Sequence, residues 1–417
     1  MMHALDVERN APVERAGIRW PGSTAGVMGL ALLCLMASPG PGWAQARFRP
    51  APEQVVLPVS LHTLGAVSQD LKAAEQAWQG DPSNLKLALR FARQAFLLGV
   101  TEGDLRWYGS AKAALMPWWT QPSLSAEGHF MRGLVKQGFH DFRGGLADID
   151  AAIALDATDA EFWSWRFALH LLAADMVAAR ADCDTMARRF EPNEARACQA
   201  ILDYHTGQAA QAVKALRVLV DAPGFQGHLA QDWLRFHLGE ALRTAGHYEQ
   251  AVATWSAHLS KRPRAHSVRL ALAELLNDLG RHTEARRWAS VPAPTDALLM
   301  QQFLASQALK DADAPRLAQQ VEERMQAQTL RQDALIERPR LLYLIRHGKD
   351  LSAGLALAQE NWALQKEPPD AVLLIEAALK SDRPQAARPV LDWMEQTRYT
   401  DPALAHLASE LRRQLGR

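Results

Sequence analysis

The residues of this chain that could do catalytic or metal-binding chemistry are its histidines, a group of aspartates and its cysteines. Of the 14 histidines, 13 follow His3, and none falls in a recognised metal-ligand spacing. His258 occupies an apolar position of an expected helix, where a packed imidazole is the simpler interpretation. The sequence also lacks HExxH, GxSxG, GxxxxGK and CxxC, and no GxGxxG follows a strand pattern. We therefore expect no catalytic residue, no metal site and no cofactor.

Four aspartates lie close together in the sequence, at Asp148, Asp150, Asp156 and Asp159. They could form a carboxylate cluster, but no acid–base pair can be placed from them. We interpret them as the solvated face and the end of one helix.

The first 46 residues have the pattern of a secretory signal peptide. Basic residues precede an apolar run of 13 residues from Ala25 to Ala37, and small residues offer a cleavage site after Ala46. The run covers only roughly 20 Å, whereas a membrane core is about 30 Å thick. We expect a periplasmic protein with no transmembrane span after cleavage; an uncleaved membrane anchor or a lipid anchor at Cys34 is the weaker alternative. Residues 47–64 read as an extended lead-in.

The charge composition is balanced. Lys and Arg together number 46, and Asp and Glu together also number 46. No bulk field therefore draws in nucleic acid or an anionic membrane surface. We expect no nucleic-acid partner.

The element that must position any site is a helical hairpin, seen best from Asp232 to Pro263. Two apolar stripes with helical spacing are separated by Gly246 and closed by Pro263. In a frame of 34 residues that starts at Asp232, Gly239 occupies position 8 and Ala251 position 20. This pattern resembles the tetratricopeptide repeat, and together with the signal segment it indicates an exported bacterial type.

The same frame recurs along the chain. Matching units begin 34 residues apart at 126 and 160, at 232 and 266, and at 334 and 368. The resemblance covers roughly residues 65–415 and implies about nine helix–turn–helix units. It predicts an all-α solenoid over residues 65–417 that forms a right-handed superhelix, with capping helices at about 65–79 and 402–415. In the first complete unit we place the turn at Gly99.

In tetratricopeptide arrays the first helix of each unit lines a concave face, and positions 2, 5, 9 and 12 point into it. The resemblance therefore implies a groove for a protein or peptide partner, and aromatic and arginine side chains there would carry much of the interface energy. The alternative for Trp233 is packing on the loop that contains Phe225. The lysine arrangement with which some relatives grip a C-terminal carboxylate is missing. The predicted groove residues are Trp233, Phe236, Glu240, Arg243, Ser267, Leu270, Glu274 and Asn277.

Trp118 and Trp119 follow Pro117 in a loop between two expected helices. Two interpretations stay open: a local plug over the first hairpins, or an exposed contact point. Exposed tryptophans would suit stacking against a glycan.

Cys183 and Cys198 are the two cysteines that follow the signal segment. They lie on consecutive antiparallel helices, at heights that differ by about 3 Å. A disulfide is therefore geometrically allowed, and an oxidising compartment favours it. Two separately buried thiols are the alternative.

These observations predict a non-enzymatic periplasmic scaffold or adaptor that binds a protein or peptide partner on its concave face. The alternative is a structural subunit of an exopolysaccharide synthesis or export complex, or of an envelope assembly complex, with glycan contacts at Trp118, Trp119 and Trp233. A hydrolase or transferase hidden in an aberrant unit would need a pocket of converging acids, histidines or metal ligands.

Overall fold

The computed structural model describes residues 69–222, 225, 227–331 and 338–416. These residues form 20 α-helices and no strand, so the expected all-α solenoid of helix pairs is confirmed. No helix in this part of the chain is both long and apolar enough to cross a membrane. The expected signal segment 1–46 and the lead-in 47–64 lie outside the described residues.

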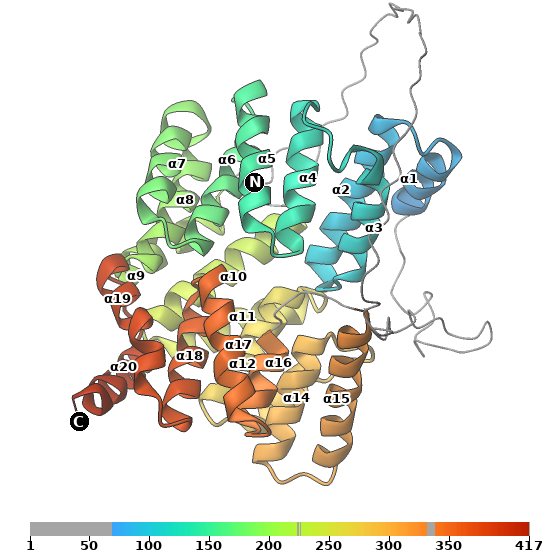
Figure 1. The fold of residues 1–417 in the computed structure, drawn as a ribbon. Coiled ribbons are helices and arrows are strands. Elements are labelled where there is room, and N and C mark those ends of the chain that lie inside the picture. The colour runs from blue at the N-terminus through green and yellow to red at the C-terminus, as the bar shows by residue number, and fades with distance from the viewer. Residues whose placement is uncertain (1–68, 223–224, 226, 332–337, 417) are drawn as a thin grey trace, which may run out of the picture.

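The helices pair in chain order. Between α1 (Gln69–Gly80) and α20 (Pro402–Leu415) they form nine hairpins (Figure 1). Short 3-10 turns, η2 (Met116–Trp118) and η3 (Pro384–Ala387), follow α3 and precede α19. The hairpins are α2 (Leu85–Glu102) with α3 (Arg106–Leu115), α4 (Ala126–Gly138) with α5 (Phe142–Leu155), α6 (Ala160–Leu172) with α7 (Met176–Arg189), α8 (Pro192–His205) with α9 (Ala209–Leu219), α10 (His228–Thr244) with α11 (Tyr248–Lys261), α12 (His266–Asp278) with α13 (His282–Ala289), α14 (Asp296–Ala308) with α15 (Ala314–Arg331), α16 (Arg338–Arg346) with α17 (Leu351–Leu364), and α18 (Pro368–Lys380) with α19 (Arg388–Thr397).

The turns inside the hairpins each depend on one residue with a left-handed backbone. Gly246 and Gly280 have φ angles of 77° and 73°. The same turn position holds Ala174 and Lys310 in other hairpins, with φ angles of 59° and 54°. Because this conformation costs a non-glycine residue roughly 1–2 kcal/mol, the packing of the two helices must hold these turns in place. Units without a turn glycine therefore fold like the others while showing a weaker sequence signal.

The turn of the first hairpin lies at Gly103, and the prediction of Gly99 is wrong. Helix α2 continues to Glu102, and Gly103 ends it with a φ angle of 65°. Gly99 lies inside α2, where an added Cβ atom would stand 2.6 Å from Tyr108 Cε1. The glycine at this position allows the Tyr108 ring of α3 to pack directly on α2.

Small residues let the two helices of a hairpin approach each other. Gly239 of α10 lies against the indole of Trp255 in α11, and a Cβ atom at Gly239 would collide with that ring. The Trp255 side chain is fully buried, and its Nε1 donates a hydrogen bond to the Arg235 carbonyl at 3.1 Å. The matching of glycine and tryptophan therefore fixes the register of this hairpin.

The solenoid curves until hairpins that are far apart in sequence meet. Figure 1 shows the C-terminal helices α18–α20, in red, beside α9 and α10. The hydroxyl of Tyr399 lies 3.4 Å from that of Thr244, and the Lys366 amide donates to the Leu172 carbonyl at 2.9 Å. The C-terminal hairpins therefore pack against the middle of the chain.

Candidate functional site: a chamber on the concave side

The concave side of the first six hairpins forms a chamber of about 370 Å³. The first helices α2, α4, α6, α8, α10 and α12 all contribute to its wall, with Met186 from α7 and two residues from connecting segments, Phe225 and Ala265. Val100 and Ser267 in the wall are exposed to solvent, so the chamber opens between α2 and α12. Its volume lies within the range typical of ligand pockets.

Aromatic and aliphatic side chains make up most of the wall. Phe96 of α2 and Trp165 of α6 meet edge to face, with their ring centroids 5.7 Å apart. The His237 ring lies between two other aromatics, 4.7 Å from the Trp233 centroid and 5.2 Å from the Phe236 centroid. Such a surface favours apolar and aromatic groups of a ligand. The aromatic residues of the wall are Phe96, Trp165, Phe167, Phe225, Trp233 and Phe236.

The histidines of the wall are neutral at physiological pH. Burial, and then the nearby His205, lower the pKa of His237 to about 3. The Tyr204 hydroxyl lies 2.8 Å from His237 Nδ1 and fixes the orientation of the ring. Burial likewise lowers the pKa of His266 to about 4. Neither imidazole therefore adds positive charge to the chamber.

Three of the predicted groove residues meet in this chamber. Trp233, Phe236 and Ser267 all line it, on the consecutive first helices α10 and α12. Phe225, which the alternative interpretation placed against Trp233, lines the same chamber. Trp233 thus keeps a face toward the cavity while it packs on the core.

Glu240 and Arg243 do not face an open groove. They pair with each other, with 2.7 Å between Arg243 Nη2 and Glu240 Oε2, and Arg243 Nη1 also lies 3.7 Å from Asp401. Asp401 caps the N-terminus of α20, where its side chain accepts a hydrogen bond from the Leu404 amide. The C-terminal segment therefore covers this part of the predicted groove, because the curvature of the solenoid brings α20 against α10.

The three remaining predicted residues lie on α12, away from the chamber wall. Leu270 packs on the small apolar cluster that contains Ala289. Asn277 is buried, and its Nδ2 donates to the carbonyl and to Oε1 of Gln301, each at 3.0 Å, so it joins α12 to α14 instead of facing a partner. Burial raises the pKa of Glu274 to about 7.

Trp118 and Trp119 pack locally. Both rings are half-buried against the core of the first hairpins. Lys112 Nζ lies 5.3 Å from the Trp119 ring centroid, and Arg132 Nη1 donates to the Trp118 carbonyl at 2.8 Å. This arrangement matches the interpretation of a plug over these hairpins.

The interpretation of Asp148 as solvated is wrong. Asp148 is buried and accepts hydrogen bonds from Arg132, Lys136 and His129, at 2.5, 2.8 and 2.9 Å. Burial opposes its ionisation, but these hydrogen bonds outweigh burial and lower the pKa of Asp148 to about 2. The sequence signal was present in the basic residues at intervals of three and four on α4, which face α5.

The other three aspartates lie nearer the surface. Asp150 and Asp156 are exposed, and Asp159 caps the N-terminus of α6 by accepting from the Glu161 amide. In the described part of the chain, no group of three or more His, Cys, Asp or Glu side chains is arranged to hold a metal ion.

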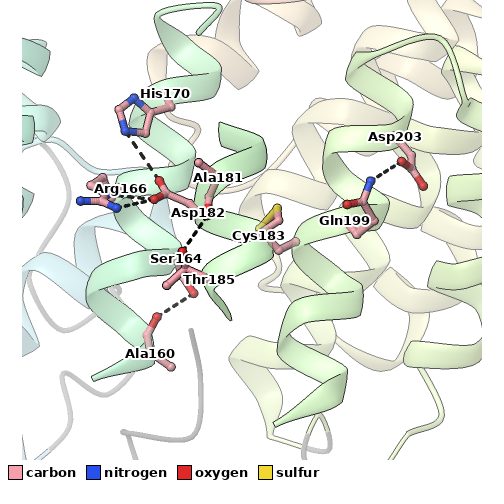
Figure 2. The surroundings of a disulfide bond; sticks show 11 residues. Ala160, Ser164, Arg166, His170, Ala181, Asp182, Cys183, Thr185, Gln199 and Asp203 are labelled. Atoms are coloured by element: carbon pink, nitrogen blue, oxygen red, sulfur yellow. Dashed lines mark hydrogen bonds and ion pairs between the residues drawn. A yellow bond between two sulfur atoms is a disulfide. The ribbon is translucent and has the colours of Figure 1, made fainter. Parts of the chain in front are cut away.

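A disulfide joins Cys183 of α7 to Cys198 of α8, with 5.5 Å between their Cα atoms (Figure 2). The bond links the third hairpin to the fourth, and Cys198 also lines the chamber. Beside Cys183, the Asp182 carboxylate holds Arg166 Nη2 at 2.5 Å and lies 3.6 Å from His170 Nε2. The contact between α6 and α7 and the contact between α7 and α8 are therefore both fixed next to the chamber.

Comparison with known proteins identifies repeats in the middle of the chain. The tetratricopeptide repeat family model matches residues 233–257 and 266–290. No curated protein matches the sequence.

Three similar solved structures match the chain at low sequence identity. The type IV pilus biogenesis factor PilW is 15% identical, covering 50% of this chain and 97% of its own, with a TM-score of 0.39. A tetratricopeptide repeat protein from Parabacteroides merdae is 16% identical over 59% of this chain and 98% of its own, with a TM-score of 0.37. A Rap protein in complex with competence and sporulation factor is 12% identical over 82% of this chain and 92% of its own, with a TM-score of 0.47.

Proposed function

We propose that this chain, a tetratricopeptide repeat protein, is a non-enzymatic scaffold that binds a protein or peptide partner in the chamber on its concave side. The observation that carries the proposal is the chamber itself, which the first helices of six successive hairpins build together and which six aromatic side chains line. Buried aromatic anchors in well-packed pockets carry much of the energy of protein interfaces. The binding segment of the partner places apolar side chains between Trp233, Phe236 and Trp165.

The proposed place of action is the periplasm. The N-terminal sequence pattern is that of an export signal. The bond between Cys183 and Cys198 supports the same location, because disulfides persist in oxidising compartments and are rare in the cytosol.

The glycan-binding alternative receives less support. It needs tryptophan faces open to solvent, whereas Trp118 and Trp119 are both half-buried and Lys112 Nζ lies over the Trp119 ring. Only Trp233 of the three residues lines an open cavity. The hypothesis of a structural subunit in an export complex requires a surface on which a glycan can stack. Trp118 and Trp119 do not provide such a surface.

Site-specific photocrosslinking tests the proposal. A benzophenone amino acid replaces Ser267 at the mouth of the chamber, or Ser409 on the exposed face of α20 as the matched control. In envelope extracts, position 267 should crosslink a partner polypeptide that position 409 does not. The double change Trp233→Ala and Phe236→Ala should lower the yield by at least about tenfold, since each lost anchor costs more than about 1 kcal/mol.

A second control tests whether a lower crosslinking yield comes from the loss of a chamber side chain or from the loss of any partly buried tryptophan. Trp288 of α13 is half-buried but does not line the chamber, so Trp288→Ala should keep the crosslink. Circular dichroism establishes that each variant retains its helices. Equal crosslinking from the two positions, or a yield unchanged by the double substitution, would reject the chamber as the binding site.

A further inference from the structure

Three acidic residues follow one another along the wall of the chamber. Glu161 of α6, Glu194 of α8 and Asp232 of α10 all line it. Two of them are paired with bases. Arg93 Nη1 lies 2.9 Å from Glu161 Oε2, and Arg262 Nη2 lies 2.9 Å from Asp232 Oδ2, while His258 Nε2 lies 2.7 Å from Asp232 Oδ1.

Glu194, between them, is the exception. It is only 8% exposed, yet its carboxylate has no hydrogen bond and no ion pair to any residue in the described part of the chain. Glu194 lines the chamber, and charges in such partly enclosed places are normally paired or bound to a cation. Its place in the first turn of α8 offers a favourable helix dipole, worth only about 1 kcal/mol, and does not explain why it faces a cavity.

The charges around the chamber do not balance. The wall contains one arginine, Arg93, against three carboxylates, and Arg262 from outside the wall neutralises one more. The two histidines of the wall are neutral, as described above. One negative charge, that of Glu194, is therefore left without a counter-charge inside a cavity lined by aromatic rings.

An aromatic cavity with one unpaired carboxylate in its wall is suited to an organic cation. Aromatic faces attract cations through the ring quadrupole, and the attraction strengthens when the cation is shielded from water. The apolar wall requires that the cation be carried on a hydrocarbon stem. Lysine combines a four-carbon stem with an ammonium group that has three hydrogen-bond donors.

We propose that the chamber binds a lysine side chain of the partner segment, with Glu194 as its counter-ion and the aromatic wall around its stem. This inference rests on the proposed function, since the lysine belongs to the partner that the scaffold binds. It adds a specificity: the partner segment is basic and apolar, and an acidic segment of the same hydrophobicity is rejected.

The chain contains a matched control for Glu194. Glu127 and Glu194 each precede the left-handed turn residue of their hairpin by 13 positions, so they occupy the same repeat position. Glu127 is exposed and does not line the chamber. Glu194→Gln and Glu127→Gln therefore remove the same charge from the same repeat position, inside and outside the site.

The first experiment tests the chemistry with small probes. Octylammonium, octanol and octanoate are titrated into the full chain, and binding is followed through tryptophan fluorescence and calorimetry. Wild type and Glu127→Gln should bind octylammonium about tenfold more tightly than octanol, and octanoate most weakly. In Glu194→Gln the preference should shrink to within about twofold. A preference that Glu194→Gln leaves intact, or octanoate binding as tight as octylammonium, overturns the proposal.

The second experiment tests whether the chamber accepts the cation as the lysine side chain of a peptide. N-acetyl-Leu-Lys-Leu-amide is compared with the peptide that has norleucine in place of lysine. Wild type should prefer lysine, and Glu194→Gln should lose that preference. If octylammonium binds but the two peptides bind equally, the assignment to a lysine side chain is wrong.

The two proposals fail separately. A crosslink at position 267 that depends on Trp233 and Phe236, together with no cation preference, keeps the scaffold function and rejects the role of Glu194. Glu194→Gln should fold as well as wild type, since the substitution removes no hydrogen bond or ion pair to the described residues; urea unfolding checks this before any titration.

Discussion

Arg264 and Glu102 form an ion pair with 2.7 Å between Nη2 and Oε1, although 162 residues separate them in sequence. Glu102 is the last residue of α2 and Arg264 lies two residues before α12, and these two helices border the mouth of the chamber. Next to it, the His266 ring lies against Gly103. These contacts border the mouth of the chamber, because the solenoid brings its sixth hairpin back to its first.

A substitution at Gly103 can test whether the first hairpin packs against the sixth in this way. Gly103→Ala places a Cβ atom in a left-handed position and against His266, so the free energy of unfolding should fall by about 2 kcal/mol. Gly109, exposed in α3 with open space around it, is the control, and Gly109→Ala should raise stability by about 0.5–1 kcal/mol. Urea titrations followed by circular dichroism measure both. Equal effects of the two substitutions would contradict the close contact at Gly103.

The disulfide should contribute measurably to stability. Cys183 and Cys198 are 15 residues apart, and closing a loop of that length stabilises a fold by about 3 kcal/mol. Reducing agent should lower the urea midpoint of wild type and leave that of a Cys183→Ala, Cys198→Ala variant unchanged. Thiol counting under denaturing, non-reducing conditions provides a direct check. Two free thiols in protein purified without reducing agent would show that the bond does not form.

Asp148 should act as a buried anchor of the second hairpin. Asp148→Asn removes the charge that pairs with Arg132 and Lys136, and the loss of a buried ion-pair partner typically costs about 3–5 kcal/mol. Asp150→Asn is the control, because Asp150 is exposed and its pair with Arg166 should contribute less than about 1 kcal/mol. Thermal unfolding of both variants at pH 7 distinguishes them. A small effect at Asp148, similar to that at Asp150, would contradict the buried cluster.

The same carboxylate predicts a pH dependence. Its folded-state pKa, about 2, lies below the ordinary value of 3.8. Because the pKa is lowered on folding, the stabilisation is present above about pH 4 and is lost as the pH falls toward 2. Between pH 4 and pH 2, wild type should therefore lose more stability than Asp148→Asn. Parallel stability curves in that range would refute this assignment.

The raised pKa of Glu274 predicts that stability depends on pH in the opposite direction. Burial raises its pKa from 4.5 to about 7, so the folded state favours the protonated form. The associated stability is present below pH 4.5 and is lost as the pH rises through 7. Glu274→Gln should match wild type at pH 4.5 and exceed it at pH 8, by up to about 3 kcal/mol. A difference that does not change with pH would exclude this titration.

Local sequence patterns determined the hairpins. Apolar residues at helical spacing, Gly246 and Gly280 in the turns, and the 34-residue interval between residues 232 and 266 are features of one unit and its neighbour. They predicted an all-α solenoid because each unit must bury its apolar face against the next. The error at Gly99 arose because the turn position of a repeat frame that starts at Leu85 falls on Gly99, whereas α2 continues to Glu102 and the left-handed residue is Gly103.

The candidate site was predictable only in part, for a physical reason. Position in the repeat indicated that Trp233, Phe236 and Arg243 would all point to the concave side. Which of them stays accessible depends on the superhelix, whose curvature accumulates from small rotations between successive hairpins. That curvature leaves Trp233 and Phe236 in an open chamber and places Asp401, which caps the C-terminal helix, near Arg243. The repeats and their concave positions follow from the sequence, whereas the curvature of the folded solenoid selects which of those positions form a cavity and which the chain covers.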